Sequence, residues 1–360
     1  MNLSRIVLTT GGTGGHIFPA LAVAEEIRRR NADAEILFVG GMGPEGELAR
    51  KAGLAFEALP ARGVLGRGLR GILGLRHVFV ALVRAVRLLG RFRPQAAVGF
   101  GGYACFAPML AARLRGVPTA LHEQNSIPGL TNRLLGKLVR RVFVSFPDET
   151  GSFKPARTVH TGNPVRPAII AAGEARKAKP GRNLLVLGGS QGARAVNDAV
   201  IEALPLLRGA NVNLRHQAGR ADELRVKKSY NQAGTEPGAV SGFIEDMAGA
   251  YAWADLVLCR AGASTVFEVA AAGKPALLVP FPHATHDHQR VNARALDEAG
   301  AGRVLEQAAL SGASLTAAVT ELLDDPDALK NMAEAARRFA RPDAAARIVD
   351  ELERMTGAAA

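Results

Sequence analysis

The segment Arg5-Ile-Val-Leu-Thr-Thr-Gly-Gly-Thr-Gly-Gly-His16 joins an apolar run to a glycine-rich turn, and a helical stretch over 19–30 follows. A short apolar run without alternation is typical of a parallel strand that is covered on both faces. Glycines between such a strand and a helix let a ligand approach the backbone closely. The segment therefore predicts a strand–turn–helix unit of an α/β protein, with ligand binding at the turn.

The same arrangement begins again later in the chain. An apolar run over 183–187 is followed by Gly188-Gly-Ser-Gln-Gly-Ala193 and a helical stretch over 195–204. We expect further strands, alternating with helices such as 264–272, at 35–39, 95–99, 119–122, 141–144, 212–217, 255–259 and 276–280. Two such units, separated by about a domain's length, indicate two Rossmann-like, doubly wound domains with a cleft between them.

The segments 161–167 and 171–181 have the composition of a linker, with proline and glycine in the first and alanine, glycine and lysine in the second. We therefore expect a first domain over 1–162 and a second over 163–341. A final helix over 342–360 is expected to pack back on the first domain.

Composition limits the function classes. The chain has 360 residues, a formal charge of +12 and two cysteines, and neither cysteine lies in a metal-binding spacing. A basic balance suggests a polyanionic partner, and unpaired cysteines fit a reducing compartment. We see no signal peptide and no run near the roughly 18 apolar residues that span a bilayer. Any membrane association is therefore expected to be peripheral.

Ala58 through His122 contain no aspartate or glutamate. Arginines interleaved with apolar residues are typical of an element that docks on an anionic membrane surface. The alternative is a buried helix with a solvated basic face. Nucleic acid is not expected as a partner, because aromatic residues for base stacking are sparse. The expected membrane residues are Leu69, Arg70, Ile72, Leu73, Leu75, Arg76, Phe79 and Leu82.

Both glycine loops precede helices, and a helix N-terminus can hold an anion through its free N–H groups and its dipole. The first loop offers Thr13, Gly14 and Gly15, and the second offers Ser190 and Gln191. Each loop alone could be only a tight turn. A dinucleotide cofactor is not expected, because no acidic residue stands at the end of the second strand.

Two later segments carry polar groups. In Cys259-Arg-Ala-Gly-Ala-Ser-Thr-Val-Phe-Glu268, we expect Ser264 at a helix N-cap and Glu268 one turn later, either on ribose hydroxyls or as plain capping chemistry. The histidines of 283–288 do not have a metal-site spacing, so no metal is expected. A sugar contact through Asp287 or Gln289 fits that loop better.

Polar residues also follow the strand at 119–122 and occupy the domain junction. His122-Glu-Gln-Asn125 comes directly after that strand, and Arg166 lies where it could reach a diphosphate. For each segment the alternative is that these groups only satisfy a loop.

Taken together, these motifs resemble the MurG family over nearly the whole chain. The matching segments, in family order, are Gly11–His16, 101–103, His122–Asn125, Gly162–Arg166, Gly188–Ala193, 250–255, Cys259–Glu268 and Asp287–Gln289. The resemblance implies a GT-B fold. It also implies an inverting transfer of N-acetylglucosamine from UDP-N-acetylglucosamine to the C4 hydroxyl of undecaprenyl-diphosphate-linked N-acetylmuramyl-pentapeptide (lipid I to lipid II).

The resemblance assigns roles residue by residue. It implies that the nucleotide sugar binds mainly to the second domain, with Glu268 on the ribose and the backbone of Ile244 on uracil. The other implied donor contacts are Ser190, Ala263, Ser264, Thr265, Val266, Phe267 and Gln289, and the reading of the second glycine loop adds Gln191. The first domain would approach the sugar and diphosphate with Thr13, Gly14, Gly15, Asn125 and Arg166.

Inversion needs a base for the attacking hydroxyl, and an imidazole suits that task. His16 is our candidate, and Glu123 is its rival. No cofactor is expected. The resemblance implies peptidoglycan synthesis, and with it cell shape and division, at the cytoplasmic face of the inner membrane, with possible cell-wall synthesis proteins as partners.

Three other functions fit these motifs less well. A UDP-N-acetylglucosamine 2-epimerase would not need the 58–89 stretch as a lipid-facing patch. A non-enzymatic recruiting subunit would not need two glycine loops and Glu268. An NAD-dependent oxidoreductase would need the missing acidic residue.

Overall fold

The computed structural model describes residues 3–60, 70–174, 181–189, 192–284 and 287–357, so Leu69, Ser190 and Gln191 lie outside the described residues. The chain divides into two compact units, one of Met1–Arg166 with Arg341–Ala360 and one of Pro167–Ala340. This division falls between Arg166 and Pro167, whereas the sequence placed it between residues 162 and 163.

The first unit is built on a seven-stranded parallel sheet of order β3-β2-β1-β4-β5-β6-β7. Its strands are β1 (Arg5–Thr9), β2 (Glu35–Gly40), β3 (Ala55–Ala58), β4 (Ala96–Gly99), β5 (Thr119–Glu123), β6 (Arg141–Val144) and β7 (Thr158–His160). Its helices are α1 (Gly14–Arg30), α2 (Glu45–Lys51), α3 (Arg70–Phe92), α4 (Phe106–Leu114), α5 (Leu130–Gly136) and α14 (Ala344–Thr356).

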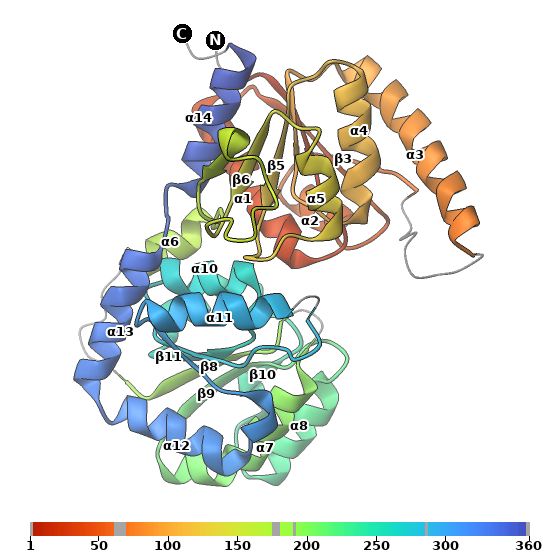
Figure 1. The fold of residues 1–360 in the computed structure, drawn as a ribbon. Coiled ribbons are helices and arrows are strands. Elements are labelled where there is room, and N and C mark those ends of the chain that lie inside the picture. The colour runs from red at the N-terminus through yellow and green to blue at the C-terminus, as the bar shows by residue number, and fades with distance from the viewer. Residues whose placement is uncertain (1–2, 61–69, 175–180, 190–191, 285–286, 358–360) are drawn as a thin grey trace. The chain divides into compact units, whose positions relative to one another are not determined.

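Helices cover both faces of this sheet (Figure 1). Side chains alternate along β1, so Ile6 and Leu8 enter one buried cluster while Val7 enters another. The strand order reverses between β1 and β4, which is where open parallel sheets bind ligands, outside the carboxyl ends of the strands. The first glycine loop follows β1 at that position.

The last helix, α14, belongs to the first unit. Ile348, Val349 and Leu352 are fully buried in the same cluster as residues of α1. Arg30 at the end of α1 pairs with Asp350 at 2.6 Å and with Glu353 at 3.1 Å. The end of the chain therefore completes the core around α1, the helix that follows the glycine loop.

The second unit contains a six-stranded parallel sheet of order β10-β9-β8-β11-β12-β13. Its strands are β8 (Asn183–Leu187), β9 (Asn213–Gln217), β10 (Val240–Ser241), β11 (Leu256–Cys259), β12 (Ala276–Leu278) and β13 (Gly302–Val304). Its helices are α6 (Pro167–Glu174), α7 (Arg194–Gly209), α8 (Glu223–Gln232), α9 (Met247–Trp253), α10 (Ala263–Ala271), α11 (His288–Glu298), α12 (Gly312–Leu323) and α13 (Pro326–Phe339).

The expectation of two parallel-sheet, Rossmann-like units is confirmed. The sequence did not predict the short edge strands β3, β7, β10 and β13, and residues 171–174, expected in a linker, belong to α6. Other differences lie at element ends. The first long helix begins at Gly14, so Gly14, Gly15 and His16 form its first turn, whereas the apolar pattern began it at residue 19. The expected N-cap at Ser264 is wrong: Gly262 caps α10, and Ser264 is its second residue. No helix among the described residues is long and apolar enough to cross a membrane.

Candidate active site

The glycine loop after β1 is fixed by backbone contact with the loop after β4. The amide of Gly11 donates to the carbonyl of Gly101 at 3.0 Å. A Cβ atom on Gly102, whose φ is +79°, would lie 2.9 Å from the Cα of Gly11. Only glycine allows this approach, so the two loops hold the start of α1 in place. Thr13, just before the helix, is exposed and makes no side-chain cap.

His16 lies in the first turn of α1 and is partly exposed. Its Nδ1 atom lies 2.7 Å from Oε1 of Gln124, a residue that follows β5. Burial lowers the pKa of His16, and hydrogen bonds to the Gln124 side chain and the Phe100 carbonyl oppose that shift. The imidazole is therefore held neutral at the carboxyl edge of the sheet, which is the state in which an imidazole can accept a proton.

Glu123, the rival base, is 2% exposed and has four hydrogen-bond donors around it. Its Oε1 accepts from the backbone and side-chain nitrogens of Asn125, and its Oε2 accepts from Gly129 N and from Asn132 Nδ2. Burial raises the pKa of Glu123, and these hydrogen bonds oppose the shift. Both oxygens hold the loop between β5 and α5, so Glu123 is placed as a loop anchor.

Arg166 reaches the side of α1 that carries the glycine loop. Its guanidinium lies 4.5 Å from the centre of the Phe18 ring. A Cβ atom on Gly14 would lie 3.0 Å from the same ring, so Phe18 sits beside the first turn. A cation therefore stands beside a helix N-terminus, and both attract an anion.

In the second unit, α10 exposes only some of the residues that are expected to bind the nucleotide sugar. Ser264, Thr265 and Glu268 are partly exposed, and Oε2 of Glu268 accepts from the Tyr251 hydroxyl at 3.3 Å. Ala263, Val266 and Phe267 are buried, and the Phe267 ring packs against that of Phe339 at 5.4 Å. The side chains of these three residues are therefore not open to a ligand contact.

Two further residues expected to bind the nucleotide sugar form hydrogen bonds within the second unit. The amide of Ile244 donates to Oε1 of Gln217 at 3.0 Å. Oε1 of Gln289 accepts from the amide of Phe281 at 3.0 Å, and so fixes the loop before α11. Asp287, with a φ of 54°, pairs with Arg290 at 3.0 Å. Sequence reasoning did not find Gln217, since nothing local marks a residue that binds one 27 positions away.

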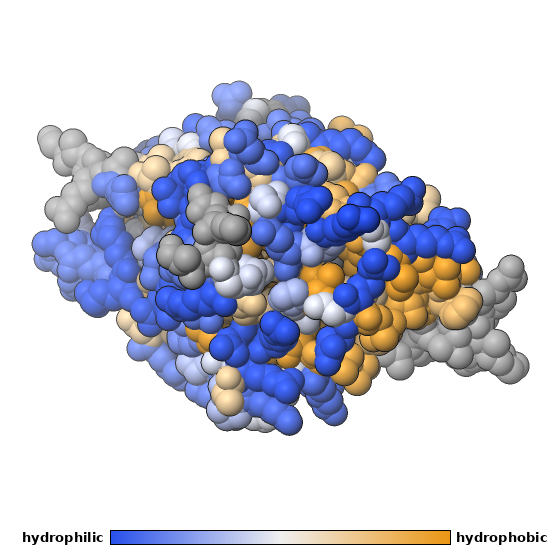
Figure 2. Space-filling view, turned by 90° about the horizontal axis from the view of Figure 1, so that it is seen from above, coloured by the Kyte–Doolittle hydropathy of each residue, from blue (hydrophilic) through white to orange (hydrophobic). Residues whose placement is uncertain are grey.

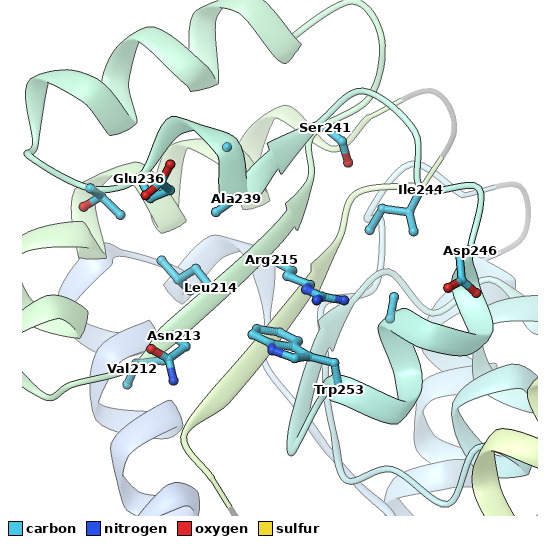
Figure 3. Close-up of a pocket in the computed structure, with 13 residues that line it drawn as sticks. Val212, Asn213, Leu214, Arg215, Glu236, Ala239, Ser241, Ile244, Asp246 and Trp253 are labelled. Atoms are coloured by element: carbon cyan, nitrogen blue, oxygen red, sulfur yellow. The ribbon is translucent and has the colours of Figure 1, made fainter.

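A pocket of about 620 Å³ lies beside β9 and α9 in the second unit. Arg215 lies over the Trp253 ring at 4.6 Å in its middle, and Ile244 and Asp246 lie at one end (Figure 3). The pocket thus borders the residue expected to hold uracil. The sequence analysis included Trp253 in the matching segment 250–255 but gave neither it nor Arg215 a role, because their pairing joins a strand and a helix that are distant in sequence.

The basic, apolar stretch falls largely on α3. Only the backbone of Arg70, Ile72, Leu73, Leu75 and Arg76 is described. Further along the helix, Phe79 is 66% exposed, while Leu82 packs partly against the core. The neighbouring helices α4 and α5 and the turn after α5 expose Leu114, Leu130, Leu134 and Leu138. Figure 2 shows hydrophobic side chains on the surface on the side where α3 lies.

Two family models match this chain. The glycosyltransferase family 28 N-terminal domain matches residues 6–144, and the glycosyltransferase family 28 C-terminal domain matches residues 183–348. Together they cover most of both parallel-sheet units and both glycine loops.

Curated relatives match the chain from end to end. The UDP-N-acetylglucosamine–N-acetylmuramyl-(pentapeptide) pyrophosphoryl-undecaprenol N-acetylglucosamine transferase of Nitratidesulfovibrio vulgaris (strain Hildenborough) is 56% identical over 354 residues, 97% of each chain. The enzyme of the same name from Geobacter sulfurreducens is 43% identical over 356 residues, which cover 97% of this chain and 98% of that one.

Solved structures with a similar fold include a MurG and an epimerase. Acinetobacter baumannii MurG superposes with a TM-score of 0.76 at 33% identity, covering 98% of this chain and 99% of that chain. The UDP-N-acetylglucosamine 2-epimerase of Neisseria meningitidis superposes with a TM-score of 0.69 at 16% identity over 97% of this chain and 100% of that chain, a likeness of fold alone. The full-length matches at high identity are thus to transferases, and this chain belongs to the MurG family of glycosyltransferases.

Proposed function

We propose that this chain transfers N-acetylglucosamine from UDP-N-acetylglucosamine to undecaprenyl-diphosphate-linked N-acetylmuramyl-pentapeptide, the reaction for which its relatives are named. The observation that carries this proposal is the match at 56% identity over 97% of the chain to one such transferase. The polar groups at the carboxyl ends of both sheets supply what the reaction needs. The epimerase alternative is not favoured, because epimerases share only the fold.

The donor binds to the second unit. Glu268 presents a partly exposed carboxylate that accepts hydrogen bonds from the two ribose hydroxyls, with the Tyr251 hydroxyl holding that carboxylate in place. Ser264 and Thr265, in the first turn of α10, donate to the diphosphate at the helix N-terminus. Ile244 offers its backbone to uracil, and Gln217 must release the Ile244 amide or share it when the base binds.

The acceptor binds to the first unit. The first turn of α1 presents the backbone of Gly14 and Gly15, and Arg166 stands beside it over Phe18. A dipole end and a guanidinium together suit the diphosphate of the lipid-linked acceptor. Asn125, held by Glu123, orients a sugar hydroxyl at the end of β5.

The chemical step is a single in-line displacement. The C4 oxygen of the muramyl sugar bonds to C1 of N-acetylglucosamine as the bond from C1 to the UDP phosphate oxygen breaks. His16 takes the hydroxyl proton, and UDP leaves with the bonding electron pair. Partial exposure and a lowered pKa suit His16 to this role, whereas Glu123 is buried and fully engaged.

The chain docks on the membrane as a peripheral protein through the first unit. Phe79 and Leu114 are each 66% exposed, on two helices that pack together. The same helices carry exposed arginines, among them Arg84 and Arg87 on α3 and Arg113 and Arg115 at the end of α4. Apolar side chains among arginines suit the cytoplasmic leaflet, where anionic headgroups lie above the acyl chains.

The test is a transfer assay with radiolabelled UDP-N-acetylglucosamine, with and without a lipid I analogue, in detergent with chelator. We expect label in a lipid product only when the acceptor is present. The Glu268→Gln variant serves as the donor-site control and should transfer less at low donor concentration. Conversion of the donor to its C2 epimer without a lipid product would overturn the proposal.

A further inference from the structure

The imidazole of His16 contacts a side chain whose orientation can be decided. Gln124 is 2% exposed, and its Nε2 lies 2.9 Å from the carbonyl of Phe100 and 3.2 Å from the carbonyl of His122. A flipped amide would direct its oxygen at two carbonyl oxygens, which cannot donate. The nitrogen therefore faces these carbonyls, and Oε1 faces His16 at 2.7 Å.

This orientation fixes the proton on His16. Oε1 of Gln124 can only accept a hydrogen bond, so Nδ1 of a neutral His16 must carry the hydrogen. Nε2 of the same ring then holds the lone pair. A histidine acts as a base through its unprotonated nitrogen, so the choice of tautomer decides which ring atom can accept a proton.

His122 lies on the other side of Gln124, and its hydrogen bonds fix its tautomer in the same way. Nε2 of Gln124 lies 3.0 Å from Nδ1 of His122, so Nδ1 accepts and Nε2 of His122 carries the hydrogen. That Nε2 lies 3.2 Å from the carbonyl of Gly162, which accepts. Burial lowers the pKa of His122 to about 4, so this ring stays neutral and adds no charge beside His16.

We infer that Gln124 is the positioning residue that holds His16 in the Nδ1–H tautomer, with Nε2 directed to take the acceptor hydroxyl's proton. The inference rests on the proposed function for the identity of that hydroxyl, but the tautomer itself does not. Gln124 plays the part that a carboxylate plays beside the histidine of a serine protease. An amide fixes the ring without a negative charge, so it stabilises the imidazolium less and leaves His16 a weaker base.

The first experiment reads the tautomer directly in the whole wild-type protein. Protonated and unprotonated ring nitrogens differ strongly in ¹⁵N chemical shift, so a long-range ¹H–¹⁵N spectrum of labelled protein assigns the tautomer of each neutral histidine. Subtraction of the His16→Gln spectrum identifies His16 among the eight histidines. We expect the hydrogen on Nδ1, and a hydrogen on Nε2 would overturn the inference whether or not the protein is a transferase.

The second experiment removes the acceptor atom. In Gln124→Leu we expect kcat to fall about 100-fold or more, KM for UDP-N-acetylglucosamine to stay within about twofold, and the Nδ1–H signature of His16 to be lost. Gln232→Leu, an exposed change in the second unit, is the matched control and should leave all three unchanged. An unchanged kcat in Gln124→Leu with the signature retained would contradict the positioning role. A normal tautomer in a wild-type protein without transferase activity would instead refute the proposed function alone.

Discussion

The carboxylate of Glu123, at the end of β5, accepts a hydrogen bond of 2.7 Å from the side-chain amide of Asn132, the third residue of α5. Asn125 and Gly129 donate to the same carboxylate from the loop between them. One buried acidic side chain therefore organises the whole connection. Glu123 is also the single acidic residue between Ala58 and Pro147, a span rich in arginine.

The Glu123→Gln variant is therefore expected to lose stability while keeping the base. The new amide would direct hydrogens at groups that themselves donate, and such a mismatch costs about 1–3 kcal/mol of unfolding free energy. Urea unfolding measures this loss, with the exposed Glu25→Gln as control. The pH below which kcat/KM falls should not change, because His16 remains the base. If kcat/KM no longer fell at low pH in Glu123→Gln, Glu123 would be identified as the base.

Glu268 offers a prediction about donor recognition. Its loss should raise KM for UDP-N-acetylglucosamine about tenfold to 100-fold, since a hydrogen bond to a charged group contributes roughly 1.5–3 kcal/mol. Tyr251→Phe should have a smaller effect, because its bond to Glu268 is 3.3 Å long. Glu298→Gln, an exposed change at the end of α11, is the control.

The ribose contact itself can be separated from general damage to α10. The wild-type enzyme should discriminate against a donor that lacks the 2′-hydroxyl, and Glu268→Ala should lose that preference. Equal discrimination by both proteins would show that Glu268 contacts another part of the donor.

Local patterns predicted the sheets and the loops but not the side-chain pairs. Apolar runs placed β1, β6 and β8 at the observed residues, because strands buried on both faces leave a continuous signal. The start of α1 was missed, because its first turn consists of glycines and a histidine without an apolar face. The bond between His16 and Gln124 joins residues 108 positions apart, and only the parallel pairing of β1 with β4 and β4 with β5 brings them together.

Prediction of the candidate site from sequence is limited in the same way. The order of the motifs predicted Glu268 and His16 near the carboxyl ends of parallel strands, where polar residues follow the strands. Neither the four donors around Glu123 nor the bond from Ile244 to Gln217 has a local signal, because each depends on a loop conformation. The buried side chains of Val266 and Phe267 follow from helix periodicity only once the start of α10 is known.

Membrane docking predicts a selective effect of surface changes in the first unit. Phe79→Ser with Leu114→Ser should weaken binding to anionic lipid vesicles about tenfold or more, since each exposed side chain that enters lipid contributes on the order of 1 kcal/mol. Leu206→Ser with Leu224→Ser is the matched control, because these leucines are 51% and 84% exposed in the second unit. Equal losses from both pairs would contradict docking through the first unit.

The lowered pKa values of two buried histidines predict how the free energy of unfolding depends on pH. Burial lowers the pKa of both His122 and His216 to about 4, below the ordinary value of 6.5. The unfolded chain therefore binds more protons than the folded one between these values, so each histidine's contribution is complete above pH 6.5 and is lost as the pH falls toward 4. Between pH 6.5 and pH 5 the loss is about 2 kcal/mol per histidine.

Urea unfolding of wild type and His216→Gln at a series of pH values tests this. Carboxylates also titrate in this range, so the decisive quantity is the difference between the two proteins. The variant should be less stable at pH 7.5, because His216 bonds to Asn197 and Tyr230 at 3.0 Å each. Its stability should then fall less steeply toward pH 5, and the two curves should converge. Parallel curves would mean that His216 titrates alike in the folded and unfolded chains, and that its burial between α7 and α8 does not keep it neutral.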